Sequence, residues 1–310
     1  MFGFVFVFGF GFGFVFVFVF VFVFVFGGQM SQTTRRVFLT TTTAALALPL
    51  AASRVDATPA VGSDTSPLKI GVASYSFRKF TLDQALAMAK QLNVRYMTFK
   101  DVHIPRTDSP DTLRATRAKI EAAGITIMGG GTITMENDPA QIRKDFEYAK
   151  AAGFPLIFAS PDPAALDTIE RLVKEFDIKL AIHNHGPEDK WYPRPEDAFN
   201  AIKGRDARMG LCVDIGHTSR TGTDFVKAIA TYKDRVLDMH VKDLSDPMNR
   251  DSQVEVGRGV FDFPRLFKTL LEIGYAGQVG LEYEIKEADP LPGMIESIAY
   301  MRGVLAAVRA

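Results

Sequence analysis

Hydrophobic positions between residues 68 and 305 follow two alternating periods, one typical of buried strands and one typical of amphipathic helices. Short apolar runs are each followed by a stretch in which apolar residues recur every three to four positions. In the first such stretch, apolar residues from Leu82 to Leu92 fall on one helical face. We predict eight strands, at residues 68–76, 94–100, 125–128, 155–160, 179–183, 209–214, 236–241 and 278–282.

A helix is predicted after every strand, and local signals set several of its ends. Ser109-Pro110 opens one helix and Gly124 closes it, while Asp138-Pro139 opens the next and Gly153 ends it. The remaining helices are expected from Leu82 and over residues 164–176, 195–202, 224–232, 263–273 and 294–305. Eight strand–helix units in about 250 residues predict a single-domain α/β fold, the closed (β/α)8 TIM barrel.

An open doubly wound sheet is the alternative arrangement of such units. It would usually carry a glycine-rich phosphate turn after its first strand. Here that turn, Ala73–Phe77, has no glycine. The three glycines Gly129–Gly131 follow the third strand and lack the spacing of a dinucleotide site, so we interpret them as a tight turn near the pocket.

The beginning of the chain departs from this pattern. Every even position from Phe2 to Phe26 is phenylalanine, with valine or glycine between, as in the translation of a short DNA repeat. Met30 is a better candidate than Met1 for the first residue of the translated protein. It is followed by Arg35-Arg36, Phe38-Leu39 and an uncharged run of small residues over 40–52. This layout resembles a twin-arginine secretory signal.

We therefore divide the chain into a low-complexity tract (1–29), a signal peptide (30–57), a linker (58–67) and the barrel (68–310). Cleavage after Ala52 and cleavage after Ala57 both fit. The expected product is periplasmic or otherwise exported, without a stable membrane span, because a span needs about 20 apolar residues. The Phe/Val tract is long enough to cross a membrane. A membrane anchor therefore remains an alternative if that tract is translated.

Charge and cysteine content exclude several classes of protein. The chain has 36 Lys and Arg and 36 Asp and Glu. Removal of residues 1–57, which hold three arginines and one aspartate, leaves 33 basic and 35 acidic residues, a net charge of −2. This balance argues against nucleic-acid binding. The single cysteine, Cys212, excludes an intramolecular disulfide and a cysteine-rich zinc site, and we interpret it as inward packing. The formation of a homo-oligomer remains an alternative to a monomer.

All five histidines fall at or just after predicted strand ends, where a barrel gathers its functional groups. They are His103, His183, His185, His217 and His240. Asp214 and Glu282 end the sixth and eighth strands. Strands five to eight thus bring His183, Asp214, His240 and Glu282 to one mouth. A mixed imidazole and carboxylate set suits one divalent ion such as Mn, Co, Zn or Fe better than Mg or Ca.

Four short motifs connect these residues to a known family. They are Asp214-Ile-Gly-His217, His240-Val-Lys242-Asp243, Gly257-Arg-Gly259 and Gly280-Leu-Glu282. With these motifs in this order, residues 68–305 resemble the xylose isomerase-like TIM barrels, also called the sugar phosphate isomerase/epimerase family. The resemblance implies that Asp214, His240 and Glu282 hold a metal together with a strand-five acid, and that His217 contacts substrate.

The chain departs from the family at strand five. Sugar epimerases of the family usually have glutamate there, whereas this chain has His183, with His185 as the alternative ligand. The symmetric pair of glutamates that removes and returns a proton is therefore broken. Glu282 or a histidine is left as the base.

Further candidates line the same mouth. The catalytic candidates are Glu282, His217, Lys242 and Glu188, and the substrate-binding candidates are His185, His103, Lys100, Trp191 and Arg220. The two lysines either stabilise an enolate or pair with Asp101 or Asp243. Glu188 is a base, an outer carboxylate or a solvated loop acid. Trp191 stacks on a sugar or caps the barrel, and Arg220 binds an anionic or hydroxyl group.

The expected function is that of an exported, divalent-metal-dependent isomerase or epimerase acting on a sugar or keto-sugar. Two alternatives remain. The first is a lyase that cleaves 3-keto-glycosides by elimination, and the second is a metal-containing sugar-binding protein without turnover. A phosphorylated substrate is not expected, because the sequence has no clear phosphate cradle.

Overall fold

The computed structural model describes residues 6–10, 14–18 and 66–310. The first two ranges are strands β1 (Phe6–Phe10) and β2 (Phe14–Phe18), which pair antiparallel. The predicted signal peptide and its cleavage sites lie outside the described residues.

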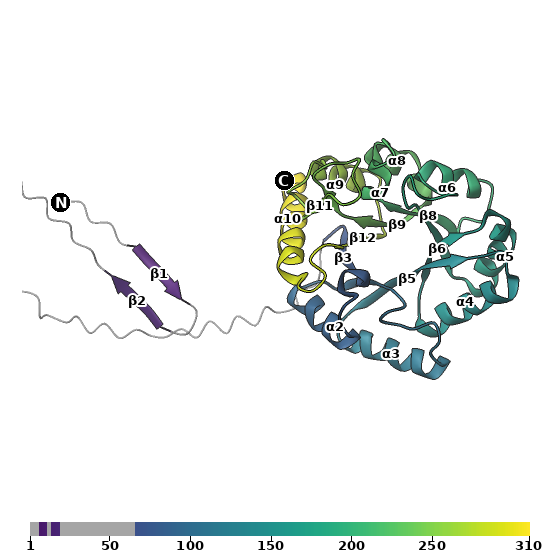
Figure 1. Ribbon diagram of the computed structural model, residues 1–310, viewed down its shortest axis with the longest axis horizontal. Coiled ribbons are helices and arrows are strands. Elements are labelled where there is room, and N and C mark those ends of the chain that lie inside the picture. Colours follow the sequence, from purple (N-terminus) through teal and green to yellow (C-terminus); the bar gives the residue numbers. More distant parts are fainter. Residues whose placement is uncertain (1–5, 11–13, 19–65) are drawn as a thin grey trace, which may run out of the picture. The chain divides into compact units, whose positions relative to one another are not determined.

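Residues 66–310 form a closed barrel of parallel strands surrounded by helices (Figure 1). The strands are β3 (Lys69–Ala73), β4 (Tyr96–Phe99), β5 (Thr126–Met135), β6 (Leu156–Pro161), β7 (Lys179–His183), β8 (Met209–Asp214), β9 (Val236–Val241) and β12 (Gln278–Leu281). Their order in the barrel follows the chain, and β12 closes it by pairing with both β9 and β3. The predicted (β/α)8 TIM barrel is confirmed.

The outer helices begin and end close to the predicted signals. They are α2 (Leu82–Gln91), α3 (Pro110–Ala122), α4 (Pro139–Ala152), α5 (Leu166–Phe176), α6 (Pro195–Ile202), α8 (Phe225–Thr231), α9 (Phe263–Glu272) and α10 (Leu291–Arg309). The Ser109 hydroxyl and the Asp138 carboxylate accept backbone N–H groups in the first turns of α3 and α4. Gly153 ends α4 in the left-handed conformation, with φ of 75°.

Several short elements were not predicted. Two of them follow strand ends, namely helix α7 (Ile215–Ser219) after β8 and a small hairpin of β10 (Asp243–Leu244) and β11 (Gln253–Val254) after β9. The 3-10 turns are η1 (Ser74–Phe77), η2 (Pro163–Ala165) and η3 (Lys233–Arg235). Because η1 takes the end of the first predicted strand, that strand is shorter than expected.

The interpretation of Gly129–Gly131 as a tight turn is wrong, because β5 runs through all three glycines as far as Met135. Their small size is needed for packing. A Cβ atom at Gly130 would lie 1.9 Å from the ring of Phe154, and one at Gly129 would lie 2.7 Å from the carbonyl oxygen of Leu156. The glycines therefore let β5 approach its neighbours closely.

Helix α10 is the one helix within the described residues whose length and apolar composition match a membrane span. The same test is passed by core helices of soluble proteins. In α10 the side chains of Met294, Ile298, Met301 and Leu305 are buried in the hydrophobic core. This burial accounts for the apolar face of the helix.

A partly buried ion pair joins the β4–α3 loop to α4. Asp145 is 2% exposed and pairs with Arg106. Burial raises the pKa of Asp145, and the charge of Arg106 opposes this shift. We expect Arg106→Met to lower the free energy of unfolding by about 1–3 kcal/mol, because an unpaired carboxylate stays buried. Chemical denaturation measures the change.

The pH dependence of this loss has a defined sign. Because the native carboxyl of Asp145 binds a proton more readily than the unfolded one, stability falls as pH rises through the raised pKa. The loss in Arg106→Met should therefore shrink in mildly acidic solution. Arg114→Met, which breaks an exposed pair with Asp111, is the control and should change stability by less than about 1 kcal/mol. Equal losses in the two variants would contradict the role given to burial.

Candidate active site

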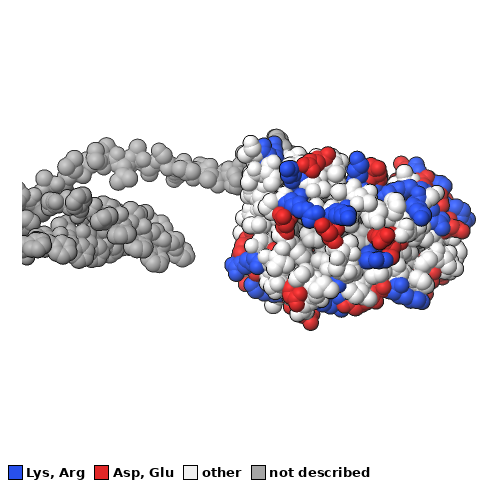
Figure 2. Space-filling view, turned by 90° about the horizontal axis from the view of Figure 1, so that it is seen from above, with Lys and Arg blue, Asp and Glu red and all other residues white. Residues whose placement is uncertain are grey.

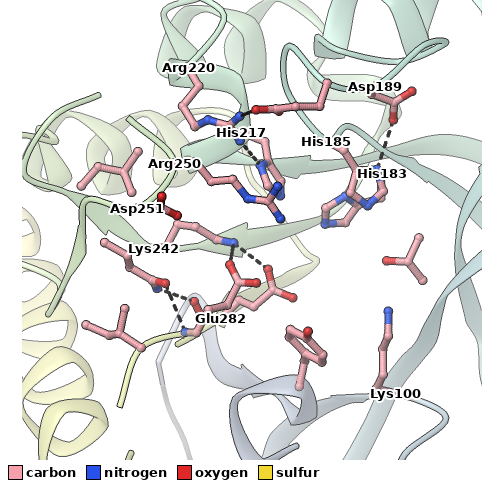
Figure 3. Close-up of a pocket in the computed structure, with 18 residues that line it drawn as sticks. Lys100, His183, His185, Asp189, His217, Arg220, Lys242, Arg250, Asp251 and Glu282 are labelled. Carbon is pink, nitrogen blue, oxygen red and sulfur yellow. Dashed lines mark hydrogen bonds and ion pairs between the residues drawn. The ribbon is translucent and has the colours of Figure 1, made fainter. Parts of the chain in front are cut away.

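A cavity of about 620 Å³ opens at the carboxyl ends of the barrel strands. Eight residues predicted from the sequence line it, namely Lys100, His183, His185, Glu188, His217, Arg220, Lys242 and Glu282 (Figure 3). The barrel places them there because the strands are parallel and their carboxyl ends share one rim. Asp214 and His240, which are buried, lie among the same groups at its base.

Four of the predicted side chains meet as a cluster. His183 and Asp214 end β7 and β8, His240 is the penultimate residue of β9, and Glu282 directly follows β12. One ligand atom from each lies within 4.8 Å of all the others. All four residues are at least nine-tenths buried. The set therefore offers two imidazole nitrogens and two carboxylate oxygens to one point.

The distances within this cluster fit a divalent ion. His183 Nε2 lies 2.9 Å from His240 Nδ1, and His240 Nδ1 lies 3.3 Å from Glu282 Oε2. Asp214 Oδ2 lies 3.9 Å from His183 Nε2. Zinc-like ions bind nitrogen and oxygen at about 2.0–2.2 Å, which places neighbouring ligand atoms about 3 Å apart. The donor set and its spacing match the metal site that the sequence predicts.

The ionisation of the two histidines is set by burial and by neighbouring carboxylates. Burial, helped by the nearby His240, lowers the pKa of His183 well below its ordinary value, so its imidazole is neutral, as a metal ligand must be. Burial also opposes charge on His240, but the carboxylate of Glu282 outweighs it and raises the pKa of His240. Metal binding at His240 would therefore compete with a proton.

Lys242 lies beside the cluster and contacts three carboxylates. Its Nζ is 3.1 Å from Asp214 Oδ2, 2.8 Å from Glu282 Oε2 and 2.5 Å from Glu284 Oε2. Burial opposes the charge of Lys242, but these carboxylates outweigh it and raise its pKa well above the ordinary value. Lys242 thus pairs with these groups rather than with Asp243. Three carboxylates against one ammonium leave two negative charges, which a divalent cation would neutralise.

Arg220 determines which nitrogen of His217 carries a proton. Arg220 Nη1 lies 3.1 Å from His217 Nδ1. Because a guanidinium only donates hydrogen bonds, Nδ1 must accept, and the neutral ring carries its hydrogen on Nε2. Burial lowers the pKa of His217, which favours this neutral form. His217 is therefore a hydrogen-bond donor at the pocket rather than a base.

The opposite tautomer is favoured at His185. Its Nδ1 lies 3.2 Å from Asp189 Oδ2, so Nδ1–H donates to the carboxylate and Nε2 keeps its lone pair (Figure 3). Burial would raise the pKa of Asp189, but hydrogen bonds from His185 and from the backbone of Tyr192 and Trp191 outweigh it and lower that pKa. An imidazole oriented by a carboxylate is the usual arrangement of a general base.

Two further contacts hold the loops around the cluster. Asn184 joins β7 to β8 and α7, because its amide oxygen accepts the N–H of Asp214 and its amide nitrogen donates to Thr218. The Asp243 carboxylate accepts backbone N–H groups from the Gly257-Arg-Gly259 loop, at 2.9 Å from Gly257 and 3.0 Å from Gly259. A side chain at Gly259 would collide with this carboxylate. The motif is therefore structural.

Some predicted residues lie elsewhere or differ in environment. His103 is buried between Ser74 and the carbonyl of Phe80 and does not line the cavity. Trp191 is exposed and lines a neighbouring hollow on the rim. Lys100 lines the cavity and makes no ion pair with Asp101 within residues 66–310. Glu188 lines the cavity and pairs with Arg220.

The cavity is also lined by polar residues that were not predicted from the sequence. They are Tyr75, Thr132, Asp189, Arg250, Asp251, Gln253 and Glu284. Arg250, Asp251 and Gln253 belong to the β10–β11 hairpin, for which the sequence carries no clear signal. Glu284 was available as the second acid of Glu282-Tyr-Glu284, and Asp189 as the acid four residues after His185. Burial raises the pKa of Cys212 well above its ordinary value, which agrees with a packing role.

The charged surface of the barrel is mixed in sign. Figure 2 shows lysine and arginine interspersed with aspartate and glutamate over the face in view. That face carries no broad basic patch of the kind that binds nucleic-acid phosphates.

Comparison with solved structures shows the same fold in an uncharacterized protein and in a sugar epimerase. An uncharacterized protein from Parabacteroides distasonis is 26% identical, with a TM-score of 0.61, over 77% of this chain and 99% of that chain. The 3-keto-D-glucoside 4-epimerase YcjR of E. coli is 17% identical, with a TM-score of 0.62, over 76% of this chain and 99% of that chain. At this identity the second likeness concerns the fold alone.

Comparison with curated proteins finds the rhizopine catabolism protein MocC of Rhizobium meliloti. The match is 29% identical over 133 residues, which is 38% of this chain and 40% of MocC. The family model of the xylose isomerase-like TIM barrel matches residues 86–304, most of the described barrel. This chain therefore belongs to the xylose isomerase-like TIM barrel family.

Proposed function

We propose that this protein is a divalent-metal-dependent enzyme that removes a proton from the carbon next to the carbonyl of a keto-sugar. The observation that carries this proposal is the position of four metal-type ligands beside an oriented imidazole in one cavity. When bound, the ion would polarise the substrate carbonyl as a Lewis acid. His183, Asp214, His240 and Glu282 would hold it.

His185 is the proposed base. Its Nε2 carries the lone pair, and Asp189 stabilises the positive charge that the ring acquires on taking a proton. The other candidates fit this role less well. Lys242 stays protonated among three carboxylates, and Arg220 holds His217 in the donor tautomer. Glu188 pairs with Arg220, and this hydrogen bond lowers its pKa.

Two further polar groups would bind the substrate and stabilise negative charge on its oxygen atoms. Lys242 pairs with Asp214 and Glu282, and its buried positive charge would stabilise negative charge that develops on a substrate oxygen bound beside it. His217 would donate its Nε2–H to a carbonyl or hydroxyl oxygen of the sugar.

Two outcomes of proton removal remain candidates. Return of the proton to the same or a neighbouring carbon gives epimerisation or isomerisation, and loss of a β-substituent gives elimination from a 3-keto-glycoside. The cavity is asymmetric, with one oriented imidazole and an ammonium on Lys242 rather than two facing glutamates. This asymmetry favours the lyase as a second candidate, since elimination needs a base and a proton donor in different places.

Hydrogen exchange tests the shared step. Incubated with Mn, Co or Zn in deuterated water, the purified barrel should introduce deuterium at a carbon next to the carbonyl of a keto-sugar, as detected by mass spectrometry. A change of configuration identifies an epimerase, and release of free aglycone from a keto-glycoside identifies a lyase. A metal-loaded protein that binds sugar and exchanges no carbon-bound hydrogen would instead be the binding protein.

We also propose that the protein is exported, on the basis of Arg35-Arg36 and the small-residue run that follows. Produced from Met30 in a bacterial host, it should accumulate in the periplasmic fraction. Changing both arginines to lysine keeps the charge but removes the motif, so this variant should stay in the cytoplasm. Equal periplasmic amounts of both proteins would contradict a twin-arginine route.

A further inference from the structure

A second hollow, of about 490 Å³, lies on the same rim of the barrel as the active-site cavity. It is lined by residues at the ends of β5 and β6 and by the loop after β7, among them Thr134, Asn137, Ser160, Asp162, Lys190 and Trp191. Its volume falls within the range of about 300–1,000 Å³ that is usual for small-molecule sites. None of these residues belongs to the metal cluster or the His185–Asp189 pair.

The two hollows share two structural elements. On β5, Thr132 lines the active-site cavity and Thr134 lines the second hollow. Alternate residues of a strand face the same side and lie about 7 Å apart. In the β7 loop, Glu188 and Asp189 line the cavity, while the next two residues, Lys190 and Trp191, line the hollow. The two hollows are therefore neighbours along β5 and the β7 loop.

Asp189 connects the two sites physically. Its Oδ2 accepts from Nδ1 of His185, while its Oδ1 accepts the backbone N–H groups of Trp191 at 2.8 Å and Tyr192 at 2.9 Å. Tyr192 is 1% exposed and anchors the loop in the core. The residue that orients the proposed base thus also fixes the backbone that carries Trp191.

Trp191 is a large aromatic side chain left open on this rim. It is 41% exposed even though Lys190 Nζ lies 4.1 Å from the centroid of its ring. Around it, Thr134, Asn137 and Ser160 make no side-chain hydrogen bonds within residues 66–310. An apolar ring face surrounded by free hydroxyl and amide groups matches a sugar ring, which has apolar C–H faces and a hydroxyl edge.

We propose that this hollow binds the second sugar unit of a glycosidic substrate, with Trp191 stacked on that unit, while the keto-sugar unit occupies the active-site cavity. The inference rests on the proposed function, because it extends the substrate from a keto-sugar to a glycoside with a further sugar. Trp191 is then a specificity determinant and takes no part in proton transfer.

The chain offers a direct probe, because Trp191 is its one tryptophan. Tryptophan fluorescence of the metal-loaded protein, and of Asp214→Asn, should change saturably on titration with the unreactive disaccharides cellobiose, maltose and trehalose. At least one of them should act at lower concentration than glucose. Asp214→Asn disables the metal cluster, so a response in that variant is independent of turnover.

Calorimetry with the same disaccharides measures what the ring contributes. Trp191→Ala should weaken binding at least about fivefold, as expected when an aromatic side chain that stacks on the bound sugar is removed. Trp191→Phe, which keeps an aromatic face, should recover most of the affinity. The two variants should keep the wild-type metal content, since Trp191 is not one of the four residues of the metal cluster.

Three results would overturn the inference. One is no disaccharide response in a protein that still exchanges hydrogen in keto-monosaccharides, which would leave the proposed function standing. Another is equal binding of disaccharides by wild type and Trp191→Ala. The third is a response to phenyl glucoside without any response to disaccharides, which would assign the hollow to an aromatic aglycone. A disaccharide response in a protein without exchange would support the hollow while the proposed function failed.

Discussion

Replacing His240 with alanine is expected to abolish tight binding of divalent metal. His240 Nδ1 lies between His183 Nε2 at 2.9 Å and Glu282 Oε2 at 3.3 Å, so its removal opens the centre of the cluster. Loss of an outer-sphere partner alone weakens metal binding by about 10–100-fold, and loss of a direct ligand should exceed this range. Elemental mass spectrometry should find about one ion per wild-type chain and almost none in the variant.

Two further variants make this measurement specific. Asp214→Ala should lose the ion as well, because it removes a carboxylate from the same point. His103→Asn is the matched control, since it removes a buried histidine that lies outside the cluster. It should keep the ion. Retention of one ion per chain in both cluster variants would place the metal elsewhere, and absence of any ion from reconstituted wild type would reject a metal centre.

Replacing His185 with glutamine is expected to slow deuterium incorporation into a keto-sugar by about 10²–10⁴-fold, the usual contribution of a positioned general base. Glutamine retains polar groups near Asp189 but cannot take a proton at neutral pH. The metal content should stay at the wild-type level, because His185 is not part of the four-ligand cluster. Single-turnover measurements at saturating substrate separate this loss from weaker binding.

Glu188→Gln is the control for this loop. The side chain of Glu188 is 54% exposed and pairs with Arg220. Its loss should change the exchange rate by less than about tenfold, because the Glu188 carboxylate is half exposed and lies outside the metal cluster. If Glu188→Gln abolished exchange while His185→Gln did not, Glu188 would be the base, as one of the sequence hypotheses holds. Loss of the metal in His185→Gln would instead make His185 the strand-five ligand.

The strand-five position illustrates how far the sequence alone leads. His183 and His185 are separated by one residue, so strand periodicity puts both on the same face and cannot choose between them. The fold separates their positions. His183 ends β7 at the base of the cavity, 2.9 Å from His240, whereas His185 turns toward Asp189 in the loop. Which of the two histidines joins the cluster depends on the path of the loop after β7.

Lys242 shows that the sequence alone does not identify the partners of a buried charge. Its position near the end of a strand predicted a cation at the mouth, but the sequence neighbour Asp243 was an equally good partner. In the fold, Lys242 reaches carboxylates that are 28, 40 and 42 residues away along the chain, while Asp243 is occupied by the Gly257-Arg-Gly259 loop. Charge pairing depends on distance in space, and only the closed barrel supplies that distance.

Local patterns along the chain are sufficient to predict the barrel and the cluster of His183, Asp214, His240 and Glu282. Both follow from local rules, since the alternation of strand and helix periods sets the topology, and parallel strands bring the residues at their carboxyl ends to one rim. Only the folded barrel shows the tautomers of His185 and His217, the partners of Lys242, the extension of β5 through its glycines and the separation of Trp191 from the main cavity. These features depend on contacts between distant segments and on loop conformation, which periodicity along the chain does not encode.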